Sequence, residues 1–268
     1  MDRRDFLASS VAAAGLGTLP AEGDAADPSA ADLGGEYYEL RRYRLRMGPM
    51  RARMDEYLRD VSIPALNRAG VSPVGAFAVA FGAVSPALYL LLTYRSLADF
   101  GGLDARLAAD DVYQRASAAH RDLPASDPAY VRIDSQLMLA FPGMPKLEVP
   151  ASAAGNKPRV FELRTYESHS KKAHKTKVDM FGKGGEIAIF RRTGLTPVFF
   201  GQNLIGPSLP SLTYMLVFDD LAARERNWAA FVADPEWKKL SATPGYTNEE
   251  IVANITSVIL RPTPYSQV

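Results

Sequence analysis

The sequence contains an internal repeat: four segments of the first half recur in the second half, in the same order and at nearly constant spacing. Tyr-Glu-Leu-Arg-Arg-Tyr at residues 38–43 matches Phe-Glu-Leu-Arg-Thr-Tyr at residues 161–166. The other matching pairs are 70–74 with 194–198, 88–97 with 212–221, and 110–113 with 234–237. Repeated segments at one spacing predict two similar folding units in a single chain.

Hydrophobic periodicity within each repeat predicts the order strand, helix, strand, strand, helix, strand. After the Glu-Leu-Arg-x-Tyr strand, the elements predicted for the first repeat are residues 49–69, 74–81, 88–94, 97–119 and 131–141. Those predicted for the second repeat are 171–192, 198–205, 212–218, 221–240 and 252–261. Glycines at 182, 184 and 185 predict a break in the helix over 171–192.

This order is the ferredoxin-like βαββαβ pattern of the α+β class, in which two helices cover one face of an antiparallel sheet. The other face of each sheet would be bare, and two copies can bury those faces against each other. We therefore predict tandem ferredoxin-like repeats at 36–142 and 159–268, joined by a linker at 143–158. Their antiparallel sheets are predicted to face each other as an intrachain α/β barrel. A homodimer is not needed to form this barrel, although helix surfaces could still associate.

Residues 1–31 resemble a twin-arginine export signal. Arg3 and Arg4 precede Phe6 and Leu7, and a weakly apolar run followed by small residues extends to Ala31. The apolar run is shorter than the ~20 residues that a membrane-spanning helix needs. We expect an exported, periplasmic protein with no stable membrane insertion after the signal is removed.

The charge and the cysteine content exclude several classes of function. Thirty-one basic and 30 acidic residues give a net charge of +1, so no overall field attracts nucleic acid, and we expect no nucleic-acid partner. The absence of cysteine excludes disulfides, thiolate metal sites and a cysteine nucleophile. With only His120, His169 and His174 in the chain, a three-histidine metal site is not favoured.

Three features together resemble the NIPSNAP family of the dimeric α/β-barrel superfamily. They are the paired Glu-Leu-Arg-x-Tyr strands, the segment 185–194, and the segment from Asn227-Trp228 to 234–237. The resemblance covers roughly residues 36–262 and is stronger in the second half; the first half lacks the tryptophans and carries Arg42 where Thr165 stands. It implies the barrel fold. It implies no single activity, because the superfamily includes monooxygenases, haem-degrading enzymes, isomerases, decarboxylases and non-enzymatic binders.

Strand alternation places two matching rows of side chains on one face of the first strands: Glu39, Arg41, Tyr43 and Glu162, Arg164, Tyr166. We expect this face to point into the space between the sheets, with Leu163 toward the helices. One interpretation is a ladder of Glu–Arg pairs across strands, which would compensate the buried charges. The other is a ligand site, in which arginine and phenol hold a carboxylate or enolate and glutamate acts as a general base.

Two further groups are candidates for the same site. His169 and His174 are not spaced to share one helix face, so they are weak metal ligands. His169 could instead act as a general base or haem ligand, and the alternative is a solvated, basic helix start. On the strand over 198–205, either Phe200 with Gln202 or Phe199 with Gly201 would line the cavity.

The sequence therefore favours a protein that binds a small apolar or carboxylate-bearing molecule, as a cofactor-independent monooxygenase or isomerase. The cofactor is left open, and none is required. The catalytic candidates are Glu162, Arg164, Tyr166 and His169, and the other ligand-binding candidates are Glu39, Arg41, Tyr43, Phe200 and Gln202. The second repeat is expected to hold the site. The alternatives are a non-enzymatic interaction protein with a packed barrel and, third, a haem-binding protein.

Overall fold

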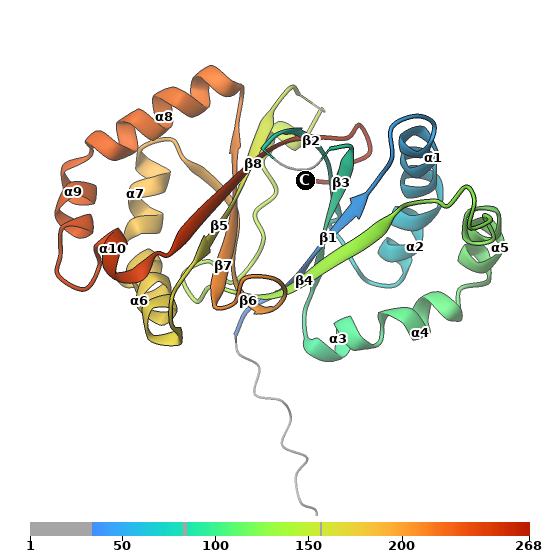
Figure 1. Ribbon diagram of the computed structural model, residues 1–268, viewed down its shortest axis with the longest axis horizontal. Helices are drawn as coiled ribbons and strands as arrows, with labels where there is room; N and C mark the ends of the chain where they lie inside the picture. The colour runs from blue at the N-terminus through green and yellow to red at the C-terminus, as the bar shows by residue number, and fades with distance from the viewer. Residues whose placement is uncertain (1–33, 83–84, 156) are drawn as a thin grey trace, which may run out of the picture. The chain divides into compact units, whose positions relative to one another are not determined.

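The computed structural model describes residues 34–82, 85–155 and 157–268, which belong to one compact unit (Figure 1). The predicted signal segment, residues 1–31, lies outside the described residues. Within the described part of the chain, no helix has both the length and the apolar composition required to cross a bilayer.

The first repeat consists of β1 (Tyr37–Arg44), α1 (Met50–Tyr57), the π-helical segment η1 (Leu58–Ser62), α2 (Ile63–Arg68), β2 (Gly75–Phe81), β3 (Ala87–Tyr94), α3 (Leu97–Gly101), α4 (Leu103–Ala108), α5 (Asp111–Arg121) and β4 (Arg132–Ala140). A 3-10 turn, η2 (Ala151–Ala153), follows in the linker. The second repeat consists of β5 (Val160–Glu167), α6 (Lys171–Gly182), α7 (Glu186–Arg192), β6 (Thr196–Ile205), β7 (Ser211–Phe218), α8 (Leu221–Ala233), α9 (Pro235–Ser241), α10 (Asn248–Ile251) and β8 (Asn254–Pro262).

The helices are more divided than the periodicity predicted. The single helix expected over 97–119 is three helices. The last of them, α5, begins where Asp110 caps it by accepting a hydrogen bond from the Tyr113 backbone N–H at 2.9 Å. The break expected in the second repeat is confirmed between α6 and α7. Gly185 lies there with a φ of +86°, a conformation that glycine adopts without steric cost.

Eight antiparallel strands close into a barrel in the order β1-β3-β2-β8-β5-β7-β6-β4. Each repeat contributes four neighbouring strands in the ferredoxin-like order, and the seams β2–β8 and β4–β6 join the two repeats. The predicted α+β fold of two tandem ferredoxin-like repeats forming an intrachain barrel is confirmed. Because the edge strands of the two repeats pair with each other, the barrel has no free sheet edge.

Every strand of the barrel has one face toward the lumen and one toward the helices. Apolar side chains from both repeats meet in the lumen, including Tyr38, Phe77, Phe161, Phe199 and Leu260. Two separate clusters lie between the barrel and its helices, one in each repeat. In Figure 1, α1 to α5 lie on one side of the barrel and α6 to α10 on the other.

The last residues of the chain cover the end of the barrel at which β5 begins. Val268 is fully buried in the lumen cluster, and its carbonyl accepts a hydrogen bond from Arg159 at 3.0 Å. The backbone N–H groups of Val74 and Ala76 donate to the side chains of Gln267 and Ser266, at 2.7 and 3.0 Å. These bonds tie the segment to β2, so one end of the lumen is filled with protein atoms.

The β4–β6 seam gives a test of the closed barrel. A Cβ added to Gly201 would lie 2.8 Å from the Cβ of Met138 on the neighbouring strand. We expect Gly201→Ala to lower the free energy of unfolding by about 1–3 kcal/mol, because an overpacked core must shift its backbone. Urea denaturation measures this value. Gly101→Ala is the control, because it adds a methyl group at a helix position with open space. This variant should unfold at an unchanged or higher urea concentration than the wild type. Equal urea midpoints of unfolding for the two variants would contradict the packing at the seam.

Candidate functional site

The charged row of β5 faces the helices and not the lumen. Glu162 is fully buried and accepts hydrogen bonds from Arg224 at 2.7 and 2.9 Å and from Trp228 at 2.7 Å, both on α8. Leu163 belongs to the lumen cluster. The predicted direction of the row is therefore wrong. Because strand side chains alternate, one wrong choice of face reverses the whole strand.

Both repeats build the same Glu–Arg–Ser arrangement on this helix-facing side. Arg41 donates to both carboxylate oxygens of Glu39, at 2.6 and 2.9 Å, and Ser135 donates to Oε1 at 2.7 Å. In the second repeat, Arg164 and Ser257 donate to Glu162 at 2.9 and 2.7 Å. The pairs run along one strand, so the predicted ladder across strands is wrong. The two serines were not predicted, although they hold matching places on β4 and β8.

The pKa values of Glu39 and Glu162 reflect these contacts. Burial alone would raise both, but the pKa of each carboxyl lies below its usual range. For Glu39 the opposing effect comes mainly from Arg41, and for Glu162 mainly from Arg224 and Ser257. Both glutamates are therefore held as carboxylates, which makes each a structural anchor and a poor proton acceptor for a substrate.

Side chains fill the helix layer of the second repeat. Arg164 lies over the Trp228 ring, 4.8 Å from its centroid, and donates to the Tyr166 hydroxyl at 3.3 Å. Lys177 and Glu186 form a buried ion pair at 2.9 Å. Aromatic rings occupy much of the remaining layer, among them Phe181, Phe190, Phe200, Tyr214 and Phe231. Arg164 and Tyr166 thus come together as predicted, but in a packed layer.

The position of Phe200 in that layer decides between the two faces proposed for β6. Phe199 belongs to the lumen cluster, and Gly201 approaches the lumen residue Met138. Phe200 and Gln202 are therefore on the helix side, and their predicted place in the barrel cavity is wrong. Phe199 and Gly201 face the lumen, as in the second alternative, but neither is among the lining residues of the cavities described below. A bulge between Pro197 and Phe199 shifts the register just before these residues.

The helix layer of the first repeat contains a cavity of about 450 Å³. Smaller side chains stand where the second repeat has phenylalanine: Ala76 for Phe200, Leu66 for Phe190 and Leu107 for Phe231. Arg41 and Tyr43, two of the predicted ligand-binding residues, line the cavity. Within the described helix layers, the cavity thus lies in the first repeat, whereas we expected the site in the second.

A stacked pair of rings forms part of the cavity wall. The Tyr57 and His120 rings lie 3.8 Å apart and 3° from parallel, and the Tyr57 hydroxyl is 3.0 Å from that of Tyr113. Tyr57 directly precedes the π-helical segment η1, an irregularity that occurs often at functional sites. This pairing was not predicted, since α1 and α5 meet only in the folded chain.

His120 has an unused nitrogen in this wall. Its Nε2 atom is buried and has no hydrogen-bond partner among the described residues. Burial lowers the pKa of His120 below its usual value, with a smaller effect from Arg53. The imidazole is therefore neutral near pH 7 and can accept a proton.

The cavity is electropositive. Arg41, Arg121 and Arg132 line it, and no aspartate or glutamate is among its described lining residues. Glu39 compensates Arg41, whereas Arg121 donates to the neutral Gln114 side chain and Arg132 to the Val131 carbonyl. Tyr43, Tyr113 and Tyr130 add aromatic surface. A cavity of this kind attracts a ligand in which an anionic group is attached to an aromatic ring.

The two histidines predicted near the barrel mouth do not join this site. His169 is exposed in a surface hollow between α6 and α10, together with Lys172, Tyr246 and Glu249. His174 is half-buried on α6, and burial lowers its pKa. Across residues 34–82, 85–155 and 157–268, no three histidine, aspartate or glutamate side chains lie close enough together to hold a metal ion.

A closed barrel of two ferredoxin-like repeats, with a ligand-sized cavity between sheet and helices, defines an α/β-barrel protein. The sequence matches the NIPSNAP family over residues 38–142 and again over residues 161–267. The chain belongs to the NIPSNAP family, with two copies of its domain. No curated protein matches the sequence.

Solved structures share this architecture. A protein from Lactobacillus acidophilus NCFM, provisionally named a monooxygenase, is 10% identical with a TM-score of 0.55, over 85% of this chain and 94% of its own. Another from Fusobacterium nucleatum, with the same provisional name, is 8% identical with a TM-score of 0.50, over 85% and 92%. A NIPSNAP-like domain protein from Burkholderia xenovorans is 24% identical with a TM-score of 0.36, over 40% of this chain and 88% of its own. At these identities the likeness to the first two structures concerns the fold alone.

The buried Glu162 site predicts a specific dependence of stability on pH. A carboxyl whose pKa is lowered in the folded state stabilises the protein above its unfolded pKa of about 4.3, and this contribution is lost as the pH falls through the folded value. We expect Glu162→Gln to lower the free energy of unfolding at pH 7 by about 3 kcal/mol, because Arg164 and Arg224 lose their buried partner. The variant should also lose less stability than the wild type between about pH 5 and pH 2.

Urea titrations at several pH values measure both effects. Glu225→Gln is the control, because Glu225 is an exposed partner of the same Arg224 and its removal should change stability by less than about 1 kcal/mol. If the two variants had the same pH dependence, Glu162 would not be the anchor of this layer.

Proposed function

We propose that the first-repeat cavity binds a small aromatic molecule carrying a carboxylate or an enolate, and that the protein is a cofactor-independent monooxygenase or isomerase acting on it. The electropositive lining without a carboxylate is the observation that carries this proposal. A volume of about 450 Å³ is in the range of small-molecule sites. Two neighbours in fold are provisionally named monooxygenases, which is consistent with the proposal, but the chemistry is argued from the cavity itself.

The proposed first step is removal of a proton from an acidic C–H or O–H group of the ligand. His120 is the candidate base, because its ring lines the cavity and its Nε2 atom has no hydrogen-bond partner among the described residues. Arg41 would stabilise the resulting enolate through charge-assisted hydrogen bonds. Glu39 holds Arg41 in place with two hydrogen bonds and therefore acts as a positioning residue.

The enolate can react in two ways without a cofactor. Return of the proton to a different carbon gives an isomer. Reaction with dioxygen at an activated methylene gives a ketone, in which the CH₂ group becomes C=O, one oxygen atom enters the product, and the other leaves as water with the two hydrogens. Both routes share the proton-removal step, so the same residues serve either reaction.

The alternative is a non-enzymatic interaction protein with a packed barrel. The packed second-repeat layer agrees with it, whereas the open first-repeat cavity opposes it. Absorption spectroscopy of the purified protein would reveal haem, the third interpretation. Native mass spectrometry would report a retained ligand and any homodimer together.

Export through the twin-arginine signal at residues 1–31 remains our proposal for localisation, and replacing Arg3 and Arg4 with lysine in a reporter fusion tests it.

Binding of an anionic aromatic probe tests the electrostatic argument. We expect 1-hydroxy-2-naphthoate to bind, and its uncharged amide to bind at least about tenfold more weakly, because only the carboxylate meets the arginines. Arg132→Gln should weaken naphthoate binding by about three- to tenfold. Arg115→Gln, on the exposed face of α5, is the matched control. Calorimetry measures the affinities, and equal binding of the acid and the amide would count against the proposal.

Hydrogen exchange tests the role of His120 as a base. In D₂O, we expect the protein to accelerate deuterium incorporation at the methylene groups next to the carbonyl of 2-tetralone, as followed by NMR. His120→Phe keeps a ring against Tyr57 but lacks the accepting nitrogen, so it should reduce this rate by about 10²-fold or more. An unchanged rate in His120→Phe would exclude His120 as the base. An oxygen electrode then distinguishes oxygenase from isomerase activity.

A further inference from the structure

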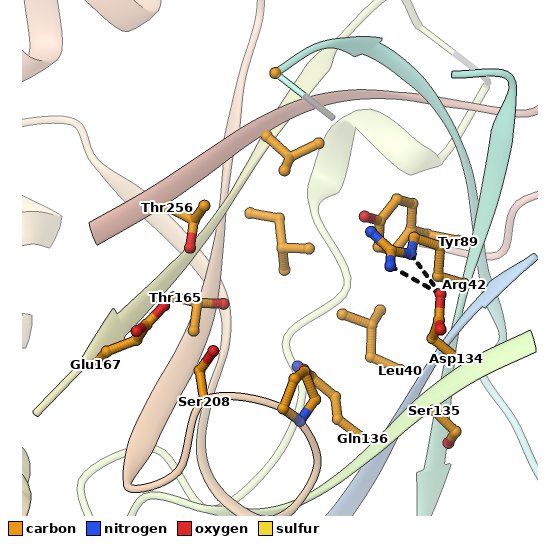
Figure 2. Close-up of a pocket in the computed structure, with 14 residues that line it drawn as sticks. Leu40, Arg42, Tyr89, Asp134, Ser135, Gln136, Thr165, Glu167, Ser208 and Thr256 are labelled. Atoms are coloured by element: carbon orange, nitrogen blue, oxygen red, sulfur yellow. Dashed lines mark hydrogen bonds and ion pairs between the residues drawn. The ribbon is translucent and has the colours of Figure 1, made fainter. Parts of the chain in front are cut away.

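A second cavity, of about 350 Å³, lies inside the barrel near the end at which β1 and β5 finish. Figure 2 shows its walls, which come from both repeats. None of its lining residues lines the first-repeat cavity. The opposite end of the lumen is covered by the last residues of the chain. A ligand here would therefore enter and leave through one end of the barrel.

The wall from the first repeat carries an ion pair. Arg42 on β1 lies with Nε 2.9 Å and Nη2 2.8 Å from Oδ2 of Asp134 on β4. Arg44 binds the same carboxylate with two hydrogen bonds, at 2.6 and 2.8 Å. Arg44 is not among the residues that line the cavity, so the lining of this wall, Arg42 with Asp134, carries no net charge.

The wall from the second repeat supplies hydroxyl groups and a carboxylate. Thr165 and Glu167 on β5, Thr256 on β8 and Ser208 in the loop between β6 and β7 line this side (Figure 2). Glu167 accepts a hydrogen bond from Asn254 at 3.2 Å, and none of the described lining residues on this wall is basic. Glu167 lies across the cavity from the Arg42–Asp134 pair, so charges of both signs line it (Figure 2).

The floor of the cavity is apolar, with a polar layer beside it. Leu40, Leu163 and Val258 form the apolar part. Next to them, Gln136 donates to the Thr213 hydroxyl at 3.2 Å, and Thr165 is hydrogen-bonded to Thr213 at 3.0 Å. This network joins the two repeats across the β4–β6 seam and fixes the orientation of two lining side chains.

These walls suit a neutral ligand better than an ion. A carboxylate ligand attracted to Arg42 would meet Asp134 and Glu167, and a cation attracted to Glu167 would meet the Arg42 guanidinium. A hydroxyl group can donate to a carboxylate and also accept from a guanidinium, so several hydroxyls on one molecule can satisfy both walls. An apolar floor fits the C–H face of a small ring.

We propose that the open end of the barrel is a second binding site, for a neutral polyhydroxylated molecule of monosaccharide or cyclic-polyol size. This inference rests on three features that lie together at this end of the barrel. They are the Arg42–Asp134 pair, the apolar floor of Leu40 and Leu163, and the hydroxyl groups of Thr165, Thr256 and Ser208. The volume of the cavity is at the lower end of the range for ligand sites, which limits the occupant to about one such ring.

Saturation-transfer NMR on the full chain tests the site with D-glucose, D-galactose and myo-inositol as probes. We expect at least one probe to bind and at least one other to bind at least about threefold more weakly, because the hydroxyl positions must match the two walls. Replacing Thr165 and Thr256 together with valine keeps the volume but removes two hydroxyls, and should weaken binding about tenfold. Thr256→Trp should abolish binding by filling the mouth.

Ile255→Trp is the matched control, because the same side chain enters the same strand on its other face. It should leave probe binding unchanged, and all variants should still bind 1-hydroxy-2-naphthoate, which reports on the first-repeat cavity. Two results would overturn the second site without affecting the proposal for the first. One is the absence of saturation transfer to every probe at about 20 mM, and the other is saturation transfer that Thr256→Trp leaves unchanged.

Discussion

Closure of the barrel is the constraint on which the rest of the structure depends. The seams β2–β8 and β4–β6 remove every free edge, so each strand has one face in the lumen and one against helices. Both faces are largely buried along most of their length, and a charged side chain on either must find a partner in the fold. The lumen accepts apolar side chains over most of its depth, whereas the helices supply polar partners such as Arg224 and Trp228.

The duplicated glutamates show how the same sequence pattern serves two outcomes. Glu39 and Glu162 are each held by an arginine two residues along the strand and by a serine on the neighbouring strand. In the second repeat, large aromatic rings complete the layer and the charges are enclosed. In the first, smaller side chains leave a cavity against Arg41. The charged framework is therefore common to both repeats, and the size of the neighbouring apolar residues decides whether it can meet a ligand.

The first-repeat cavity and the cavity at the open end of the barrel are lined by different charges. The first-repeat cavity concentrates positive charge against tyrosine rings and the neutral His120. The barrel mouth sets the Arg42–Asp134 pair against the Glu167 carboxylate and adds hydroxyls. The described linings of the two cavities share no residue.

The sequence by itself determined the fold, because the repeat and its periodicities leave few arrangements that bury two half-covered sheets. It also determined that Glu39, Arg41 and Tyr43, like Glu162, Arg164 and Tyr166, lie on one face of a strand. Alternation cannot say which face meets the helices, since a period of two is the same in both directions; the tertiary contacts of Glu162 with α8 decided that. Tertiary structure alone brought Tyr57 to His120 and placed Arg42 and Thr165 in the walls of one cavity, because these residues lie on elements far apart in the chain. It also placed the open cavity in the repeat with the smaller side chains, since packing depends on volumes summed over several elements.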